Sequence, residues 1–575
     1  MYLRATAQKR KDGTLIRYLQ LAHNVWDPVQ KRSRAQIVYS FGREDAANRA
    51  ALERLVSSVS RFLEPEAALS ATFGEDFSFM ESRPMGGAYV LDALWHRLGI
   101  DQTMRRLLKG RRLDPRAERV LFALVANRAL APSSKLAAAR WVTEDVEIQG
   151  LPDTTDDQCY RAMDFLLEIA PALEREVFHQ VAGLLNLEVD LLFFDTTSTY
   201  FCLDEADAPV RRDGRGRRCA CSGDADAGAE AGGGPSAGFR TFGKNKDHRD
   251  DLPQIVIGMA VTRGGIPVRV WSWPGNTADS ALIRQVKEDL RDWTLSRIVW
   301  VADRGFSSAE NRRYLRRGDH HYIIGERLRS GSALAKAALS RAGRYQEVAE
   351  NLKVKEVKIA EGERFVICFN PEAAERDAAV RVRLVARLTE MIADSDGLSP
   401  TKRAELRGVI STKPGLHRYL RVTAGGLLRI DAQAITAEEK LDGKYLLRSS
   451  DPTLSAEDIA LGYKQLLEVE RGWRDMKHVL DLRPVYHRKE ERIRAHVLLC
   501  WLALLLIRVA ETSCEDTWPN LRRDLQRLQV GTFEGSAGTF RRRTQITRTQ
   551  RAILAQLKLS EPSEIQDLQA AAQAS

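Results

Sequence analysis

The order of apolar runs between residues 186 and 332 restricts the fold more than any other feature of the sequence. An apolar strand, LEVDLLFFD, is expected to end at Asp195, and two more runs, QIVIGMAVT and IPVRVWSW, flank Gly264-Gly265 as in a hairpin. TADSALIRQVKEDLRDW has a helical period and is followed by strand-like RIVWVAD, helix-like SSAENRRYLRRG and strand-like HYIIGERL. Strands that alternate with helices in this way predict an α/β fold with a mixed sheet.

This order of elements is that of a ribonuclease-H-like catalytic core. Residues 333–450 interrupt it with strand-like stretches, LKVKEVKIAEGERFVICFN and KYLLRSS, around a charged helical stretch, and we interpret them as a β-rich insertion. A helical pattern returns at Ser455, where SAED resembles a capping box with Asp in place of the usual Glu. One helix is expected from there to about Lys477, and a second, from Lys489 to Glu511, is expected to cover the sheet.

Smaller parts are predicted on either side of this core. Residues 1–50 alternate around Asp12-Gly13, a pair favoured in tight hairpins, and AQIVYSFG would add a third strand. A helix is expected from Asn48 to about Phe62, and residues 204–238 are interpreted as a flexible insert because they are rich in Gly and Ala. The predicted domains are a basic β-rich region (1–50), a helical domain with possible DNA binding (80–185), the core in two parts (186–332 and 451–512), the insertion (333–450) and a basic helical C-terminal region (513–575).

The net charge of +10 is concentrated toward the two ends of the chain. Residues 1–43 carry nine Lys or Arg and two Asp, and residues 471–558 carry eighteen basic and nine acidic side chains. Basic ends around a carboxylate-bearing middle suit a polyanion such as double-stranded DNA, although a basic surface also serves solubility alone.

The sequence argues against a membrane or secreted protein. The longest apolar run, Val497 to Ile507, has 11 residues, whereas roughly 20 are needed to span a bilayer. The N-terminus has no apolar signal core, and the seven cysteines are scattered. The one close pair, Cys219 and Cys221, has no partner at zinc-finger spacing. We therefore expect a soluble cytoplasmic protein without a membrane partner.

Three acidic residues have contexts that suit a metal site. Asp195 and Asp303 each end or follow an apolar strand, and Glu470 lies in a helical segment seven residues from both Tyr463 and Lys477. Seven residues make nearly two helical turns, so the side chains of Tyr463, Glu470 and Lys477 are expected to share a face. Two Mg²⁺ ions held by such carboxylates suit phosphodiester cleavage. Taken singly, each aspartate suits a turn or helix cap, and Glu470 suits a solvated helix surface.

Together these stretches resemble the DDE transposases of bacterial insertion sequences, in the group with a Y-x2-R-x3-E-x6-K signature. YKQLLEVERGWRDMK matches the signature at Tyr463, Glu470 and Lys477. Leu466 stands where the signature has arginine. The candidate substitutes are Lys464, Arg471 and Arg474, of which only Arg474, one turn beyond Glu470, shares its face. The resemblance covers roughly residues 85–512 through GKNKDHRDDLPQIVIGMAVTRGGIPVRVWSWPGNTAD, DRGFSSAENRRYL and PVYHRKEERIRAHVLLCWLALLL.

This resemblance implies that Asp195, Asp303 and Glu470 hold two Mg²⁺ ions, for which Mn²⁺ can substitute. It implies that Tyr463 and Lys477 contact DNA near the scissile phosphate. It also implies a homodimer that pairs the terminal inverted repeats of the element in a synaptic complex, at the nucleoid in the bacterial cytoplasm. The expected function is cleavage at the element ends and transfer of the freed 3′-hydroxyl to target DNA. A nuclease that cuts without joining, and a catalytically dead DNA-binding repressor, are the alternatives.

Further polar and aromatic residues are candidates for DNA contact, and each also suits a structural role. The basic candidates are Lys246, His248 and Arg249 before a core strand, Arg488, Arg492 and His496 on one face of the last core helix, and Arg541, Arg542 and Arg543 near the C-terminus. The tryptophans at 271 and 273, with Asn276, suit either stacking on a flipped base or packing in the core.

Overall fold

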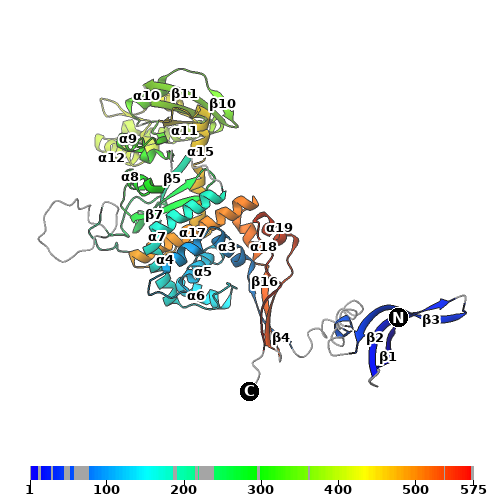
Figure 1. Ribbon diagram of the computed structural model, residues 1–575. Coiled ribbons are helices and arrows are strands. Elements are labelled where there is room, and N and C mark those ends of the chain that lie inside the picture. The colour runs from blue at the N-terminus through cyan, green and yellow to red at the C-terminus, as the bar shows by residue number, and fades with distance from the viewer. Residues whose placement is uncertain are drawn as a thin grey trace. The chain divides into compact units, whose positions relative to one another are not determined.

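The computed structural model describes most of the chain, and its helices and strands are labelled in Figure 1. By their contacts the described residues divide into two units. The described residues are 2–10, 15–27, 30–44, 52–56, 77–185, 191–213, 218, 238–293, 298–329, 331–360, 363–535 and 538–570. The first unit comprises Met1–Arg83, Gln529–Gln545 and Ser563–Ser575, and the second comprises Pro84–Leu528 and Ile546–Pro562. The finer division into domains that we expect from the sequence stays a prediction.

The N-terminal strands of the first unit form as the sequence predicts. β1 (Tyr2–Lys9), β2 (Leu15–Asp27) and β3 (Arg32–Arg43) make an antiparallel sheet in which Lys9 pairs with Leu15. The Asp12-Gly13 turn lies outside the described residues, as does most of the helix expected from 48 to 62, of which residues 52–56 are described and helical.

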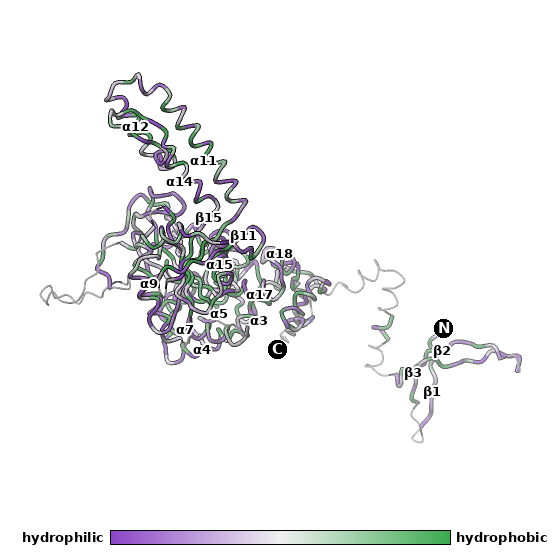
Figure 2. The backbone as a smooth tube through the Cα atoms, turned by 90° about the horizontal axis from the view of Figure 1, so that it is seen from above, coloured by the Kyte–Doolittle hydropathy of each residue, from purple (hydrophilic) through white to green (hydrophobic). Residues whose placement is uncertain are grey.

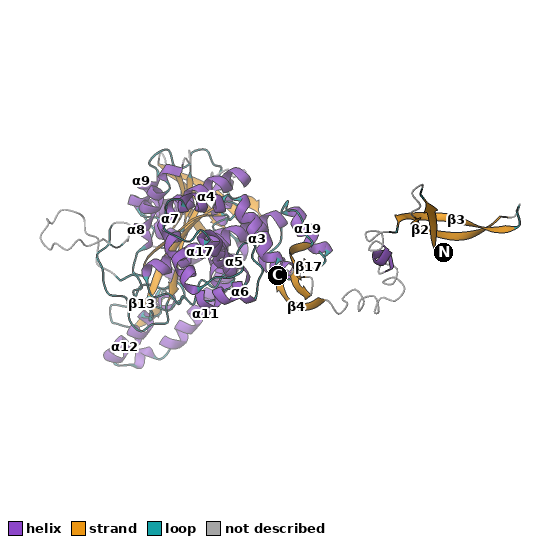
Figure 3. Ribbon diagram, turned by 60° about the horizontal axis from the view of Figure 1, so that its bottom comes forward, coloured by secondary structure: helices purple, strands orange, loops and turns teal. Residues whose placement is uncertain are grey.

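A four-stranded sheet in the first unit was not predicted. Its order is β18-β17-β16-β4, with the bounds β4 (Phe77–Pro84), β16 (Gln529–Gly535), β17 (Gly538–Arg543) and β18 (Ile565–Ala570) (Figure 3). The prediction of short basic helices for 513–575 was therefore wrong for these strands. Cross-strand aromatic contacts help to explain them, because the Phe533 ring lies 4.8 Å from Phe540 and 5.4 Å from Phe79. The contact of Phe79 with Phe533 joins segments far apart in the chain, so it leaves no local pattern.

A nine-stranded mixed sheet organises the second unit. Its order is β10-β11-β12-β15-β9-β8-β5-β6-β7. The strands are β5 (Leu191–Tyr200), β6 (Gln254–Thr262), β7 (Pro267–Pro274), β8 (Val299–Ala302), β9 (His321–Glu326), β10 (Gln346–Ala349), β11 (Leu352–Ala360), β12 (Glu363–Phe369) and β15 (Lys444–Ser449). β5 is parallel to β8 and β8 to β9, whereas the other pairs are antiparallel. The predicted hairpin is confirmed, and its Gly265 has the positive φ of 75° that favours glycine.

The segment predicted to be a β-rich insertion differs from that expectation in two ways. Its strands β10, β11, β12 and β15 continue the large sheet, since β15 pairs directly with β9. The rest is mostly helical, and residues 384–435 contain a small hydrophobic core of their own. Its elements are α10 (Ala333–Ser340), α11 (Pro371–Ile392), α12 (Pro400–Ser411), α13 (Pro414–His417), β13 (Leu420–Val422), β14 (Leu428–Ile430) and α14 (Ala432–Glu439). Figure 2 shows α11 and α12 extending away from the helices near α17 (Glu490–Cys514).

The predicted helices before the core form and pack on a buried central helix. They are α3 (Gly86–Arg97), α4 (Ile100–Leu108), α5 (Ala117–Leu130), α6 (Lys135–Glu144) and α7 (Asp156–Leu185). α5 and α7 both contact α17 (Glu490–Cys514), which also contacts β7. Among the described helices, α17 is the one long and apolar enough to cross a membrane, but its apolar window is 94% buried inside the fold. It is therefore the core helix of this unit.

Helices cover both faces of the sheet. α8 (Asp279–Asp289) packs Leu282 and Ile283 with Phe194 and Trp271 on one face, near α9 (Ala309–Leu315). The other face carries α15 (Ala456–Lys464) and α16 (Leu467–His478). A Cβ on Gly472 would lie 2.6 Å from the Met259 Cε, so glycine lets α16 approach β6 closely.

The segment expected to be one helix from Ser455 to Lys477 is two helices. The predicted capping box is present, because the Ser455 and Asp458 side chains bond each other's backbone N–H groups. α15 then ends at a tight turn, in which Leu466 N donates to Tyr463 O and Glu468 N donates to Gln465 O. These are i to i+3 bonds, which replace the regular helical pattern for about one turn. The helical period of the sequence continues across the turn and therefore does not show it.

Candidate active site

The candidate site lies at the point along β5 where its pairing with β8 ends. β5 pairs with β6 from Leu192 to Tyr200, but it pairs with β8 only from Leu191 to Phe194. Among the described strands, β5 therefore has no partner on the β8 side from Asp195 onward. Asp303 directly follows β8 at the same place. The prediction that the strand ends at Asp195 was wrong, since β6 keeps β5 extended for five more residues.

Asp195 is held by a lysine from the loop before β6. Its side chain is 16% exposed, and Lys246 Nζ lies 3.4 Å from Oδ1. The same ammonium donates to Thr196 O and, at 3.0 Å, to Thr196 Oγ1. Burial raises the pKa of Asp195, the charge of Lys246 opposes this rise, and the charge of Asp303 adds to it, so the pKa stays above its usual range. The two aspartates are thus near enough to interact electrostatically.

The charges of all three predicted carboxylates act on Tyr463. Its ring stacks on Tyr445 with centroids 6.1 Å apart. Burial raises the pKa of Tyr463, and the charges of Asp303, Asp195 and Glu470 raise it further, although Arg304 opposes them. The hydroxyl therefore stays protonated at neutral pH and can donate a hydrogen bond. Glu470 is exposed on α16.

The structure supports the chemistry of a metal site without showing a complete one. Among the described residues, no group of three or more His, Cys, Asp and Glu side chains is arranged to hold a metal ion. Asp195 and Thr196 nevertheless place three oxygen atoms around one cation, the Lys246 ammonium. Hard oxygen donors of this kind fit a divalent ion such as Mg²⁺. Shared coordination by Asp195, Asp303 and Glu470 stays a prediction.

Lys477 is paired with a carboxylate that the sequence did not single out. Its Nζ lies 3.1 and 3.0 Å from the two oxygens of Asp247, and Arg483 Nη1 lies 2.7 Å from Oδ2. Burial raises the pKa of Asp247, but the hydrogen bonds and charges of Lys477 and Arg483 outweigh this and lower it. Arg483 also lies 4.9 Å from the centre of the Tyr200 ring. No motif marked Asp247 or Arg483, because their partners are more than 200 positions away.

Asp247→Asn is expected to destabilise the second unit by about 2 kcal/mol, because it leaves two cations without their carboxylate. Lys477 is only 9% exposed, so water compensates poorly for the loss. The measurement is the free energy of unfolding by urea. Asp251→Asn is the control, since Asp251 pairs with Arg249 at an exposed position. Equal stability of the two variants would contradict this assignment.

The other predicted DNA-contact residues differ in their surroundings. His248 and Arg249 are exposed, and Arg249 pairs with Asp251. Arg474 and Arg488 are exposed too, without a hydrogen bond or ion pair to the described residues. Arg492 lies 3.5 Å from Asp164 and packs over Tyr160, which ties it to α7.

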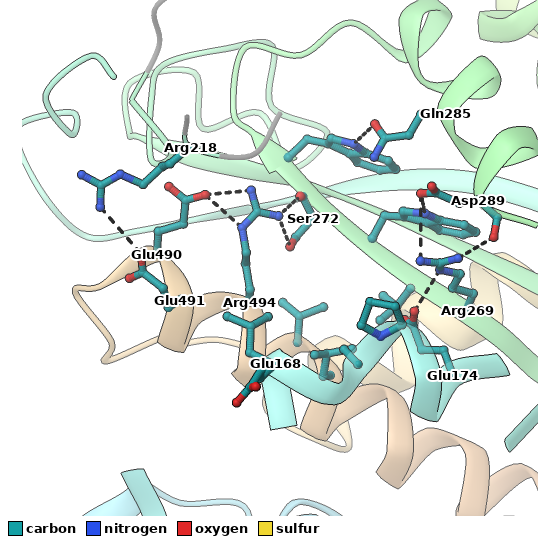
Figure 4. A pocket seen from close by; sticks show the side chains of 18 residues that line it. Glu168, Glu174, Arg218, Arg269, Ser272, Gln285, Asp289, Glu490, Glu491 and Arg494 are labelled. Carbon is teal, nitrogen blue, oxygen red and sulfur yellow. Dashed lines mark hydrogen bonds and ion pairs between the residues drawn. The ribbon is translucent and has the colours of Figure 1, made fainter. Parts of the chain in front are cut away.

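One basic candidate and the two tryptophans lie inside the fold. His496 is buried, with Nε2 3.1 Å from Leu482 O, so its predicted contact with a phosphate was wrong. Trp271 and Trp273 line a cavity of about 360 Å³, where their indole N–H groups donate to Asp289 and Gln285 (Figure 4). Both rings pack in the hydrophobic core, which confirms the packing alternative over base stacking. Asn276 is exposed.

Because Gly325 of β9 has no side chain, the Tyr463 hydroxyl can lie close to the β9 backbone. A Cβ at this position would lie 2.5 Å from the Tyr463 hydroxyl oxygen. Gly325→Ala is therefore expected to destabilise the protein by about 1–3 kcal/mol through overpacking. Urea unfolding measures the loss, and Gly397→Ala, which meets no atom within 4 Å, is the control. Adding Tyr463→Phe removes the clashing oxygen and should restore stability; no restoration would contradict the explanation.

Comparison with known proteins assigns the family. Residues 207–506 match the family described as transposase DDE domain, and residues 3–69 match the N-terminal domain of IS1634 family transposases. The chain is a DDE transposase. As an insertion-sequence transposase it binds DNA, cleaves it and transfers strands with the help of a divalent metal. Asp303, Tyr463, Glu470 and Lys477 lie within the matched DDE region, whereas Asp195 precedes it.

Other comparisons add little to this assignment. No curated protein matches the transposase. Among solved structures, a piggyBac transposase synaptic complex with hairpin DNA is similar at 11% identity over 78% of this chain and 82% of that chain. The TM-score of 0.35 is too low to relate the two folds.

Proposed function

We propose that the transposase cuts the ends of its element and joins them to target DNA with Asp195, Asp303 and Glu470 as its metal-binding carboxylates. The observation that carries this proposal is the position of Asp195 and Asp303, which directly follow the paired residues Phe194 and Ala302 where β5 and β8 stop pairing. The charge of Glu470 acts on the neighbouring Tyr463, which supports its inclusion. Two Mg²⁺ ions, or Mn²⁺ in their place, would activate the attacking oxygen and stabilise the leaving oxygen.

We infer a ribonuclease-H-like core from the strand order. Within the large sheet, β7-β6-β5 form an antiparallel meander, and β8 and β9 follow in parallel to β5. The order β7-β6-β5-β8-β9 is that expected of such a core, with Asp195 on its central strand and Asp303 after the adjacent one. We also propose that the transposase belongs to the group with the Y-x2-R-x3-E-x6-K signature, in which Leu466 stands at the arginine position.

The chain's own residues have separate tasks in this proposal. The protonated Tyr463 hydroxyl donates a hydrogen bond to a phosphate oxygen of the DNA, as its raised pKa allows. Arg474 is exposed on the helix that bears Glu470 and contacts the DNA backbone, and Lys477 on the same helix does so by exchanging Asp247 for a phosphate. Lys246, His248 and Arg249 approach from the loop before β6, and Arg488 and Arg492 from the region around the start of α17. Phosphate contacts of this kind position the DNA without reading its sequence.

The proposed assembly is a homodimer that pairs the two terminal inverted repeats of the element before joining them to target DNA. The basic ends of the chain support contact with DNA beyond the active site. The expected location is the bacterial cytoplasm, at the nucleoid.

A strand-transfer assay tests this function. The purified protein is incubated with Mg²⁺, a plasmid and a labelled duplex that carries the inverted repeat found beside the reading frame. The expected products are a cut end and a labelled plasmid, both lost when EDTA removes the metal. A cut end without any joined plasmid would establish the nuclease alternative instead. Binding without either product would establish the repressor.

A further inference from the structure

We propose that Asp279 is a positioning residue for this reaction, which holds the Lys246 ammonium against Asp195 through the hydroxyl of Thr196. This inference rests on the proposed role of Asp195. Asp279 is the first residue of α8 and lies far in sequence from the predicted carboxylates. Nothing in the sequence pattern marked it as part of the site.

Asp279 lies on the face of the sheet that α8 covers, whereas Glu470 lies on α16 at the other face. Its Oδ1 accepts a hydrogen bond of 2.7 Å from Thr196 Oγ1. The Thr196 residue is only 1% exposed, so its hydroxyl depends on protein partners. The second oxygen, Oδ2, lies 3.6 Å from the point where a Cβ on Gly305 would sit. Asp279 thus lies beside β5 and also beside the turn that follows Asp303.

The direction of the hydrogen bonds follows from the groups involved. A lysine ammonium only donates, so Thr196 Oγ1 must accept from Lys246 Nζ at 3.0 Å. The single hydroxyl proton of Thr196 is then free to go to Asp279, whose carboxylate only accepts. The chain of donors therefore runs from Lys246 to Thr196 and from Thr196 to Asp279. Lys246 also donates to Asp195 Oδ1 at 3.4 Å.

This chain gives Asp279 a specific effect on the site. Because the hydroxyl proton of Thr196 points to Asp279, a lone pair of the Thr196 oxygen stays available to the Lys246 ammonium. Charge-assisted hydrogen bonds to Asp279 and from Lys246 strengthen each other across the hydroxyl. The ammonium is thereby kept at the open edge of β5, where it holds the Asp195 carboxylate in one orientation. An acidic residue in the first turn of a helix also favours the helix itself, and the experiment has to separate these two roles.

The test compares four variants in strand cleavage and in binding of the element end. Asp279→Ala and Thr196→Val each remove one link, and each is expected to lower the cleavage rate by about 10–100-fold, as loss of a partner that orients a metal ligand does. Thr196→Ser keeps the hydroxyl and should retain activity within about threefold. The double variant should be no slower than the slower single variant, because both changes break the same chain. All four should bind the DNA end with unchanged affinity.

Controls separate positioning from folding and from the proposed function. Glu288→Gln changes an exposed residue near the other end of α8, which accepts a hydrogen bond from Tyr314, and should leave cleavage unchanged. Thr196→Val keeps the side-chain shape and remains informative if Asp279→Ala fails to fold. Normal cleavage by Asp279→Ala, additive losses in the double variant or a Thr196→Ser variant as slow as Thr196→Val would each overturn the inference. If Asp195→Asn also cleaves normally, the proposed function itself fails.

Discussion

Replacing Asp195 with asparagine is expected to reduce strand cleavage on the order of 10³-fold, since metal ligands supply several kcal/mol of transition-state stabilisation. The change keeps the size of the side chain and removes its negative charge. Lys246 binds the Asp195 carboxylate, and the charge of Asp303 acts on it. This carboxylate is therefore central to the proposed metal site. Binding of the element end should persist, because the basic residues of the site remain.

Cleavage of a labelled end and a gel shift on the same DNA measure the two effects of this change. Calorimetric titration with Mg²⁺ should show weaker metal binding by the Asp195→Asn variant. Asp319→Asn is a matched control, because Asp319 is exposed and has a positive φ that asparagine tolerates. Undiminished cleavage by the Asp195 variant would remove the basis for the whole metal site.

Local sequence patterns predicted the framework of the core. The hairpin at Gly264-Gly265, the capping box at Ser455 and the strand before Asp303 are confirmed, because each depends on residues close together in the chain. The apolar periods of α7 and α17 likewise predicted helices that the structure contains. Short-range patterns of this kind need no knowledge of the tertiary partner.

Long-range contacts explain what the sequence did not reveal. The polar stretch after Asp195 remains a strand because β6 pairs with it to Tyr200. The arginines of β17 lie in a strand because β16 and β18 flank them. Similarly, the carboxylates of Asp247 and Asp279 join the site through partners 230 and 83 positions away. None of these pairings follows from composition or period.

Arg508→Met is expected to destabilise the second unit by about 3 kcal/mol, because it leaves the Asp475 carboxylate without its cation and removes one of the two arginines that pair with Glu511. Arg508 is 2% exposed, and its guanidinium pairs with Glu511 and, at 2.6 Å, with Asp475 Oδ2. Asp475 lies on α16 and Arg508 on α17, so this pair ties the helix of Glu470 to the central helix. Glu511 keeps its bonds to Arg471 and to Trp518 N, which limits the loss.

Urea unfolding measures the destabilisation by Arg508→Met, and Arg523→Met is the control on an exposed arginine that lies 4.0 Å from the neighbouring Asp524. Adding Asp475→Asn should recover part of the lost stability, because it removes the carboxylate charge that Arg508→Met leaves unpaired. Cleavage by Arg508→Met should also fall under conditions in which the protein is folded, because α16 then loses an anchor to α17 and Glu470 its fixed position. Stability equal to that of Arg523→Met would show that the buried pair contributes nothing. Full cleavage in a destabilised variant would show that the pair of Arg508 with Asp475 does not position Glu470.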